Sequence, residues 1–287
     1  MKRIKRTTGA VLALASAAAV ALTGCSSGAS GSTVAADCKP AHEGLTTITK
    51  GTLTVANYDY PPFSYMENGK LAGVEGEVMQ KIADNECLSI KLVTGDSSAM
   101  ITSVQTGRAD TTLGSWYRTK KRSEVVRLSQ PVISSPMSVV STNGINTLEQ
   151  LMQEPAVGAG QALVGADELQ GLLGAKLKLY ANDDAQFADL KAGRTQAVVL
   201  GYGAALAQLK KNPVDGAVVK PLSPDERWSP TVGVGQTNFP VNKDNEALGK
   251  AIDENIDALR KDGTLKQLAE KYGFDPSVAE PGEPNLL

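Results

Sequence analysis

The alternation of short apolar strands with amphipathic helices is the feature of this chain that most constrains its fold. In the first half, strands are expected at 51–57, 90–95 and 109–115, separated by helices at 76–86 and 98–107. Strands and helices that alternate in this way form βαβ units, whose strands run parallel beneath the connecting helices. The first half is therefore expected to form a parallel sheet covered by helices.

A second series of the same kind starts after Pro131. Its strands are expected at 155–160, 176–181 and 196–201, and its helices at 164–173, 184–191 and 203–210. Two amphipathic helices, EALGKAIDENIDALRKDG and TLKQLAEKYG, follow, and each stops at a glycine. We predict a two-lobed α/β protein with mostly parallel sheets flanked by helices, and a ligand site between the lobes at the carboxyl ends of the strands.

Residues 1–24 have the pattern of an export signal. Basic residues precede the apolar run GAVLALASAAAVAL, which is too short to cross a bilayer core of ~30 Å. The sequence LTGC at 22–25 resembles a bacterial lipobox, which implies cleavage before Cys25 and a lipid on that cysteine. An ordinary signal peptide that contains a cysteine by chance is the alternative.

Residues 25–50 are expected to form a lipidated N-terminus and a flexible tether. The stretch after Cys25, SSGASGSTVAAD, is rich in glycine, serine and alanine, a composition typical of flexible linkers. We expect a folded body outside the cytoplasm, held at the outer face of the cytoplasmic membrane by the lipid on Cys25 alone. No second long apolar run occurs in the sequence.

Composition excludes several classes of partner. Without the four basic residues of the signal segment, 25 Lys and Arg remain against 31 Asp and Glu, a balance of −6. That balance argues against binding to nucleic acid or to an anionic membrane surface. The single histidine, His42, and the absence of a CxxC motif leave too few ligands for a metal site, and we expect no cofactor.

The cysteines are consistent with an exported protein. With Cys25 lipidated, Cys38 and Cys87 remain as an even pair in an oxidising compartment. We expect a disulfide between them. The alternative is two isolated thiols.

Five blocks in a fixed order resemble one protein family. They are GTLTVANYDYPPFSY, GKLAGVEGEVMQKIA, SVQTGRADTTLGSWYRTKKR followed by VVRLSQP, LKAGRTQAVVLGYGAALA, and DALRKDGTLKQLAEKYG. Together, over residues 51–275, they resemble the family 3 extracellular solute-binding proteins of ABC importers, the polar amino-acid type. The resemblance implies two lobes joined by two crossover strands, near 136–140 and 236–241, with the C-terminal helices returning to the first lobe. It assigns 51–137 with 240–287 to lobe 1, and 138–239 to lobe 2.

The resemblance also implies ligand contacts in the first lobe. Tyr60, in DYPPF, matches an aromatic residue that stacks over the ligand, and Asn57 lies near a polar contact to its amine. Pro61 and Pro62 restrict the loop that carries the ring. The alternative is that Tyr60 and Phe63 are aromatic residues of the hydrophobic core without a ligand contact.

Arg122 is the strongest candidate. It follows Thr119 by three residues, and the resemblance implies that its guanidinium binds the ligand carboxylate with two parallel hydrogen bonds. The alternative is a surface cation. Ser115 and Tyr117 fall where the family uses backbone and small hydroxyl groups. Trp116 and Tyr117 depart from the pattern by adding aromatic bulk, and packing of either ring between the lobes is the alternative to a ligand contact.

Two departures in the second lobe bear on the ligand. The expected hydroxyl-bearing turn reads Ala162-Leu163-Val164, and Gly201 stands where the family has an aspartate for the ligand ammonium. A buried ammonium without a counter-charge is costly. Either another acid, such as Asp59, Glu75 or one not yet placed, binds the ammonium, or the ligand is not a standard α-amino acid. Leu163 and Tyr202 are expected in the second-lobe wall, where Tyr202 and Gln161 offer neutral polar contacts.

Glu75 and Glu77 resemble a catalytic pair of carboxylates. Because they lie two residues apart at the start of a helix, we interpret them as structural residues that cap the helix and complement its dipole.

The resemblance implies a monomeric substrate-binding subunit without enzyme activity. It would capture an amino acid or related carboxylate by closing its cleft, and deliver it to an ABC permease in the membrane. One alternative is a sensor lipoprotein without a transport role. Another is an enzyme on the same scaffold, similar to cyclohexadienyl dehydratases, which would need a general acid in the cleft.

Overall fold

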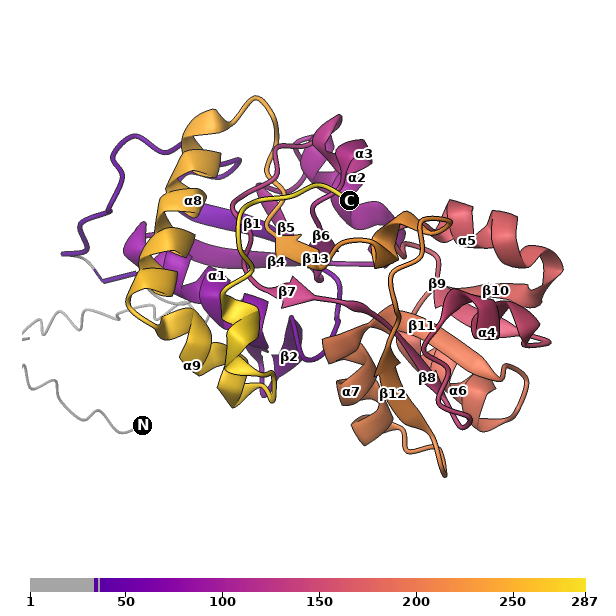
Figure 1. The fold of residues 1–287 in the computed structure, drawn as a ribbon. Helices are drawn as coiled ribbons and strands as arrows, with labels where there is room; N and C mark the ends of the chain where they lie inside the picture. The colour runs from indigo at the N-terminus through magenta and orange to yellow at the C-terminus, as the bar shows by residue number, and fades with distance from the viewer. Residues whose placement is uncertain (1–33, 36) are drawn as a thin grey trace, which may run out of the picture.

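The computed structural model describes residues 34, 35 and 37–287. The expected signal peptide at 1–24 and the lipidation site Cys25 lie outside the described residues. The described chain forms two lobes that lie side by side, with the strands β7 and β13 between them (Figure 1). Among the described residues, no helix is both long and apolar enough to span a membrane.

The first lobe is built on a parallel sheet with strand order β4-β1-β5. Its strands are β1 (Thr52–Asn57), β4 (Ser89–Thr94) and β5 (Thr111–Leu113). Its helices are α1 (Val74–Asn85), α2 (Ser97–Gln105), α3 (Lys120–Ser123), α8 (Glu246–Lys261) and α9 (Thr264–Lys271), followed by the 3-10 turn η3 (Pro276–Ala279). A small antiparallel hairpin joins β2 (Tyr65–Glu67) and β3 (Lys70–Ala72).

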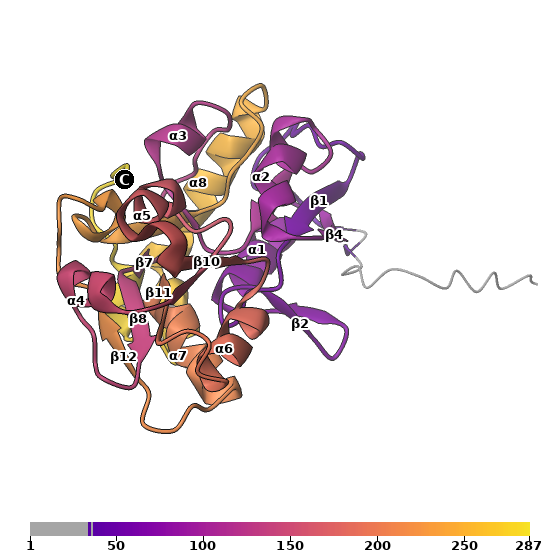
Figure 2. The same ribbon diagram turned by 90° about the vertical axis from the view of Figure 1, so that its right-hand side faces the viewer.

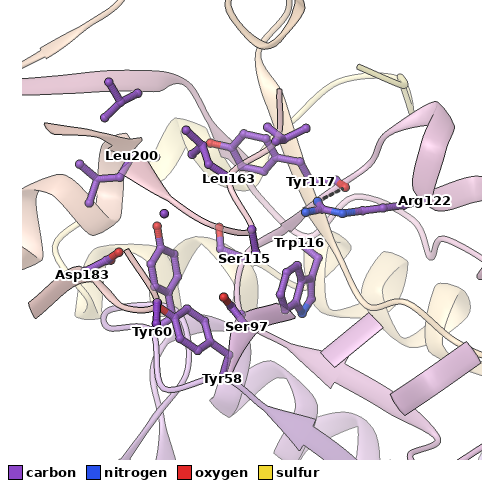
Figure 3. A pocket seen from close by; sticks show the side chains of 17 residues that line it. Tyr58, Tyr60, Ser97, Ser115, Trp116, Tyr117, Arg122, Leu163, Asp183 and Leu200 are labelled. Carbon is purple, nitrogen blue, oxygen red and sulfur yellow. Dashed lines mark hydrogen bonds between the residues drawn. The ribbon is translucent and has the colours of Figure 1, made fainter. Parts of the chain in front are cut away.

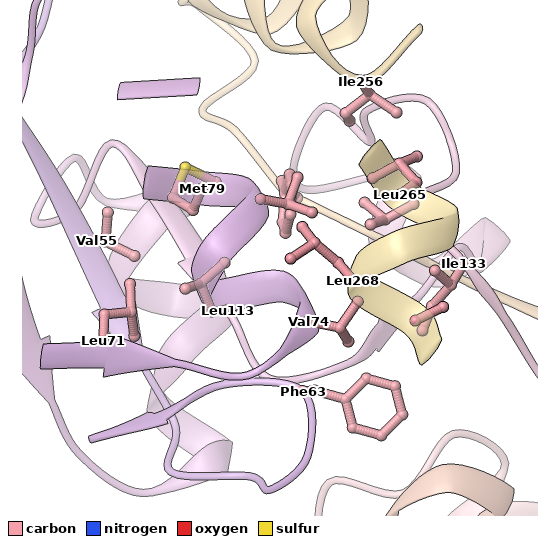
Figure 4. Close-up of a cluster of buried hydrophobic side chains, with 14 of the residues drawn as sticks. Val55, Phe63, Leu71, Val74, Met79, Leu113, Ile133, Ile256, Leu265 and Leu268 are labelled. Carbon is pink, nitrogen blue, oxygen red and sulfur yellow. The ribbon is translucent and has the colours of Figure 1, made fainter. Parts of the chain in front are cut away.

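The side chains of β1 alternate between two packing layers. Leu53 and Val55 belong to the cluster formed with α1, α8 and α9, and Ala56 belongs to the cluster formed with α2. In the first cluster, Val74 and Met79 of α1 lie among buried side chains of α9 (Figure 4). Such burial of apolar surface on both faces is the main stabilising contribution to the lobe.

The second lobe is built on a five-stranded sheet with order β10-β9-β11-β8-β12. Its strands are β8 (Met137–Ser141), β9 (Val157–Gly160), β10 (Leu177–Tyr180), β11 (Ala197–Gly201) and β12 (Val218–Pro221). Its helices are α4 (Leu148–Gln153), α5 (Ala166–Leu173), α6 (Asp183–Lys191) and α7 (Tyr202–Lys211), with the 3-10 turns η1 (Gly174–Lys176) and η2 (Ser229–Thr231). Figure 2 shows α6 and α7 on one side of this sheet and α4 and α5 on the other.

The expected fold class is confirmed, and most of the expected elements are present. β9, β10 and β11 pair in parallel, but β8 runs antiparallel to both β11 and β12. Strand β12 and the hairpin of β2 and β3 were not expected from the sequence. β8 overlaps the crossover strand expected near 136–140, but it is paired within the sheet of the second lobe. Neither β8 nor β12 belongs to a βα repeat, so the alternation that predicts the other strands does not reach them.

Three short strands connect the lobes. β6 (Trp116–Tyr117), β13 (Gly235–Asn238) and β7 (Ser134–Ser135) pair antiparallel in that order. The chain leaves the first lobe after β7 and returns along β13 (Figure 1). The lobe boundaries at 137 and 240 stay a prediction.

The segment 281–287 crosses this connection. The side-chain amide of Gln236, in β13, donates to the carbonyls of Pro281 and Glu283. Leu287 exchanges backbone hydrogen bonds with Arg118 and Lys120, so the segment ends beside α3 (Figure 1). It therefore holds the stretch before Arg122 to the connecting strands.

A disulfide joins the N-terminal segment to the end of α1, as expected. Cys38 and Cys87 are bonded, with 5.8 Å between their Cα atoms. Nearby, His42 contacts two carboxylates: its Nδ1 lies 2.7 Å from Glu86 and its Nε2 lies 2.9 Å from Glu254 on α8. The disulfide and the histidine together bind residues 38–42 to the first lobe.

We expect loss of the disulfide to lower the free energy of unfolding by about 4 kcal/mol, the chain-entropy value for a loop of this length. The bonded cysteines are 49 residues apart. The measurement is urea denaturation of the Cys38→Ser/Cys87→Ser variant beside the oxidised protein. A reductant should destabilise the wild type and leave the variant unchanged, and equal stability of both proteins would contradict the prediction.

We expect His42 to make the folded protein less stable as pH rises through neutrality. Hydrogen bonds to Glu254 and Glu86 raise its pKa above the ordinary 6.5. Because the folded-state pKa is the higher one, the contribution is complete below about pH 6.5 and is lost as pH rises through the raised value.

The test is the unfolding free energy of His42→Gln and wild type between pH 5 and pH 9. The stability difference should be about 1 kcal/mol at low pH and disappear at high pH, since the cluster is partly exposed. A difference that does not change with pH would show that the histidine acts through packing only.

Candidate ligand-binding site

A cavity lies between the two lobes, where the carboxyl ends of the strands from both sheets meet. From the first lobe it is lined by Tyr58, Tyr60, Ser97, Gly114, Ser115, Trp116, Tyr117 and Arg122. From the second lobe it is lined by Gly160, Ala162, Leu163, Val164, Ala181, Asp183, Val199, Leu200 and Gly201. These residues follow or end β1, β5, β9, β10 and β11, the position expected for a ligand site in open α/β sheets.

The cavity is narrow. Its volume of ≈ 70 Å³ is enough for a few water molecules. Aromatic rings from the first lobe and aliphatic side chains from the second face one another across it (Figure 3). A solute that occupies the cavity is therefore small and contacts residues of both lobes.

The structure brings seven of the nine expected contact residues to this cavity. They are Arg122, Tyr60, Ser115, Trp116, Tyr117, Leu163 and Gly201. Asn57 and Tyr202 are not among the lining residues. Asn57 is the last residue of β1 and is buried, with no hydrogen-bond partner for its amide in the described chain. Tyr202 is the first residue of α7, and its backbone N–H donates to Pro136.

Arg122 lies on the short helix α3, which Thr119 caps by accepting a hydrogen bond from the Arg122 backbone N–H. Its Nη1 donates to the carbonyl of Tyr117 at 2.8 Å, and its guanidinium lies 5.1 Å from the centre of the Trp116 ring. Burial lowers its pKa to about 10. The described chain offers it no carboxylate partner. The guanidinium is thus positioned, charged at neutral pH, and free to bind an anion.

Tyr117 fills the space between the lobes. Its hydroxyl donates to the carbonyl of Ser135 at 2.6 Å, and a Cβ placed on Gly235 would lie 2.5 Å from its ring. The same hydroxyl would lie 3.0 Å from a Cβ on Gly201. A side chain at 201 would therefore have to displace the tyrosine or Ser135, whose Oγ would be 3.1 Å away.

Glu75 supports the turn that carries Ser115. Its Oε2 accepts hydrogen bonds from the backbone N–H groups of Gly114 at 3.2 Å and Ser115 at 2.9 Å. Burial raises the pKa of this carboxyl to about 6, against the effect of these two bonds. The side chain is structural as interpreted, but it holds the turn after β5 and does not cap α1.

Glu77 also has a structural contact. It accepts hydrogen bonds from Lys271 at 2.5 Å and from the hydroxyl of Tyr272, and it does not cap α1 either. The two glutamates therefore face different partners and do not form a catalytic pair.

Tyr58 and Tyr60 form an aromatic wall at the other end of the cavity. Their rings stack with centres 5.3 Å apart, and Tyr60 stacks in turn on Phe63 at 5.5 Å. Burial raises the pKa of both phenols, and the carboxylate of Asp183 is the largest charge effect on each. Both hydroxyls are thus neutral at physiological pH and close to a negative charge.

Asp183 is a lining residue that the sequence reasoning missed. It is the first residue of α6, directly after the cap Asn182, whose side chain accepts from the N–H of Ala185. Its position could have indicated this role, because Asp183 lies just after the strand expected at 176–181. The carboxyl ends of parallel strands meet at the edge of the sheet where ligands bind. Tyr58 and Ser97 were also not expected as lining residues. All three residues of the turn Ala162-Leu163-Val164 line the cavity, and their side chains add no polar group.

Metal binding finds no support in this region. Within residues 34, 35 and 37–287, no three His, Cys, Asp or Glu side chains are grouped to hold a metal ion. The polar groups of the cavity are suited to hydrogen bonding and charge pairing.

We expect Glu75→Ala to lower the unfolding free energy by about 2–4 kcal/mol, because two buried backbone N–H groups lose their acceptor. Glu75→Gln keeps a carbonyl oxygen there and should cost far less at pH 7, where the wild-type carboxylate is charged and buried. Urea denaturation of the three proteins measures this. Equal losses for both variants would indicate that the side chain acts by packing rather than by hydrogen bonding.

The chain was compared with known proteins. The family described as bacterial extracellular solute-binding proteins, family 3, matches residues 53–275. The L-cystine-binding protein TcyJ of Escherichia coli is 30% identical over 241 residues, which are 81% of this chain and 87% of TcyJ. The probable amino-acid-binding protein YxeM of Bacillus subtilis is 29% identical over 222 residues, 74% of this chain and 79% of YxeM.

Solved structures give a consistent result. An ancestral arginine-binding protein bound to arginine superposes with a TM-score of 0.69 and 27% identity, covering 78% of this chain and 99% of that one. The ancestral amino-acid-binding protein AncCDT-1, a precursor of cyclohexadienyl dehydratase, has a TM-score of 0.66. Its 22% identity shows a shared fold alone.

Proposed function

Because the chain belongs to the bacterial extracellular solute-binding proteins of family 3, we propose that it is the substrate-binding subunit of an ABC importer. It captures a small amino acid or related carboxylate in the cavity between its lobes and delivers it to a permease. The observation that carries this proposal is Arg122, a guanidinium that lines the cavity without a carboxylate partner in the described chain.

Arg122 is suited to bind the carboxylate of the solute. A guanidinium donates two parallel, charge-assisted hydrogen bonds to a carboxylate and keeps its proton at any physiological pH. The contact with Tyr117 uses Nη1 and the ring of Trp116 supports the guanidinium plane, so the group is oriented before the solute arrives. Preorganisation of this kind lowers the entropic cost of binding.

Capture depends on closure of the lobes. The cavity takes lining residues from both lobes, so a bound solute contacts both. Phe274, just after α9, packs so tightly on Gly203 of α7 that a Cβ there would collide with its ring. Such contacts hold the lobes together, and a solute that touches both lobes shifts the population toward this closed arrangement.

The remaining parts of the proposal concern the membrane. A lipid on Cys25 would hold the protein at the outer face of the cytoplasmic membrane. Because the disulfide and His42 attach residues 38–42 to the first lobe, the tether that lets a monomer reach its permease would be the stretch between Cys25 and Cys38. The names of the relatives and neighbours make L-cystine, L-arginine and L-glutamine the first solutes to test.

The experiment is a thermal-shift screen of residues 34–287 with these amino acids, followed by calorimetry on the hits. A solute at one hundred times its dissociation constant should add about 2.7 kcal/mol to the unfolding free energy. Organic acids and sugars serve as comparison classes. A folded protein that responds to sugars and to none of the carboxylates would contradict the proposal.

We expect Arg122→Ala to weaken solute binding by about 2–5 kcal/mol, or roughly thirty-fold to several thousand-fold, since the partner carboxylate would lose a buried counter-charge. Lys121→Ala is the matched control, because Lys121 is the neighbouring cation and is exposed. Calorimetry should find the control unchanged. Unaltered affinity in a folded Arg122→Ala protein would remove this residue from the site.

A further inference from the structure

We propose that Asp183 binds a protonated amine of the solute at the end of the cavity away from Arg122. The substrate class is therefore a small zwitterion that offers a carboxylate to Arg122 and an amine with N–H donors to Asp183. This inference rests on the proposed function and names the substrate class of the same site. No acid of the second lobe was expected to take this role, because position 201 is a glycine.

The two charged residues lie on different lobes and face the same cavity. In Figure 3, Arg122 and Asp183 lie on opposite sides, with Ser115, Trp116 and Tyr60 between them. Among the described residues that line the cavity, Asp183 is the sole acid and Arg122 the sole base. A solute that spans the cavity thus meets a cation at one end and an anion at the other.

Asp183 is buried and has no partner in the described part of the chain. Its side chain makes no hydrogen bond or ion pair, and its Oδ2 is a buried oxygen without a donor. The next residue shows the contrast, since Asp184 pairs with Lys211 at 2.9 Å. A buried acceptor that is left unsatisfied costs free energy, and a ligand that donates to it recovers that cost.

The surroundings of Asp183 suit a cation. Burial, with a smaller effect from Asp184, raises the pKa of the carboxyl to about 7, so an adjacent positive charge is needed to keep it fully ionised. Tyr58 and Tyr60 lie close enough for this carboxylate to raise the pKa of both phenols. Aromatic faces beside a carboxylate attract ammonium groups, and the unpaired oxygen selects those with N–H donors.

The other acids considered for this role are engaged or misplaced. Oε2 of Glu75 accepts from two backbone N–H groups; its Oε1 has no partner in the described chain, but Glu75 does not line the cavity and so cannot meet the solute there. Asp59 is exposed and accepts from the N–H of Met66. Position 201 is a glycine, and a Cβ there would lie only 3.0 Å from the hydroxyl of Tyr117 and 3.1 Å from Oγ of Ser135. The geometry leaves Asp183 as the acid available to the solute.

The test compares zwitterions with twins that lack the amine. Calorimetry on residues 34–287 uses L-cystine against dithiodipropionate, L-glutamine against glutaramate, and γ-aminobutyrate against butyrate. We expect at least one zwitterion to bind about 30-fold or more tightly than its twin, the loss associated with a buried charge pair that lacks one partner. This comparison uses the wild-type protein alone, so it does not depend on whether a variant folds.

Asp183→Asn should abolish that preference, with zwitterion affinity falling to the level of the twin. Asp184→Asn is the matched control and should keep both affinity and preference, because its carboxylate pairs with Lys211 outside the cavity. Without solute, Asp183→Asn should melt at a higher temperature than wild type, since it removes an unpaired buried charge. A higher melting temperature together with weaker binding is not the result of simple misfolding.

The outcomes separate this inference from the proposed function. If Asp183→Asn keeps full affinity and preference, or if the twins bind wild type as tightly as the zwitterions, while Arg122→Ala loses binding, the amine role of Asp183 is wrong and the carboxylate-binding function stands. If folded wild type binds neither zwitterions nor twins, the proposed function fails and takes this inference with it.

Discussion

The contact of Tyr117 with two glycines is the constraint on which the arrangement of the site depends. Its ring packs on Gly235 in the strand that returns from the second lobe, and its hydroxyl reaches Ser135 beside Gly201. Its carbonyl receives the hydrogen bond that orients Arg122. Tyr117 of the short strand β6 therefore contacts the connecting strands, lies beside the end of β11, and orients Arg122. No larger residue fits at Gly235 without displacing this ring.

The buried charged groups around the cavity differ in whether the protein supplies them with hydrogen-bond partners. Glu75 accepts from two backbone donors through Oε2 and holds the turn at Ser115, so it contributes to the scaffold, although its Oε1 has no partner in the described chain. Asp183 lacks such donors, and Arg122 retains donors that no described carboxylate accepts. Unsatisfied charged groups destabilise a folded protein. A solute that carries both charges would pair with both side chains. Its binding would then recover the free energy that the folded protein loses by burying these charged groups without partners.

The sequence predicts the repeating elements better than the connections. Strands β1, β9, β10 and β11 and the helices between them have periodic apolar patterns, which local physics can interpret. The connecting strands β6, β7 and β13 have two to four residues each and no period of their own. Their pairing joins segments more than one hundred residues apart, as in Trp116 with Asn238, and only the tertiary fold determines it.

The candidate site shows the same division. Arg122 could be predicted because the family resemblance places an arginine three residues after a threonine, here Thr119, which caps α3 in the structure. The acid that faces the solute amine could not be predicted in the same way. Whether position 201 or position 183 can present a carboxylate to the cavity depends on which side chains lie beside each position. At Gly201 that space is taken by Tyr117, which arrives from the other lobe. At the start of α6 the space opens onto the cavity. The tyrosine at 117 leaves little room for a side chain at 201, so the second lobe has glycine there. In our proposal, Asp183 supplies the negative charge that position 201 does not.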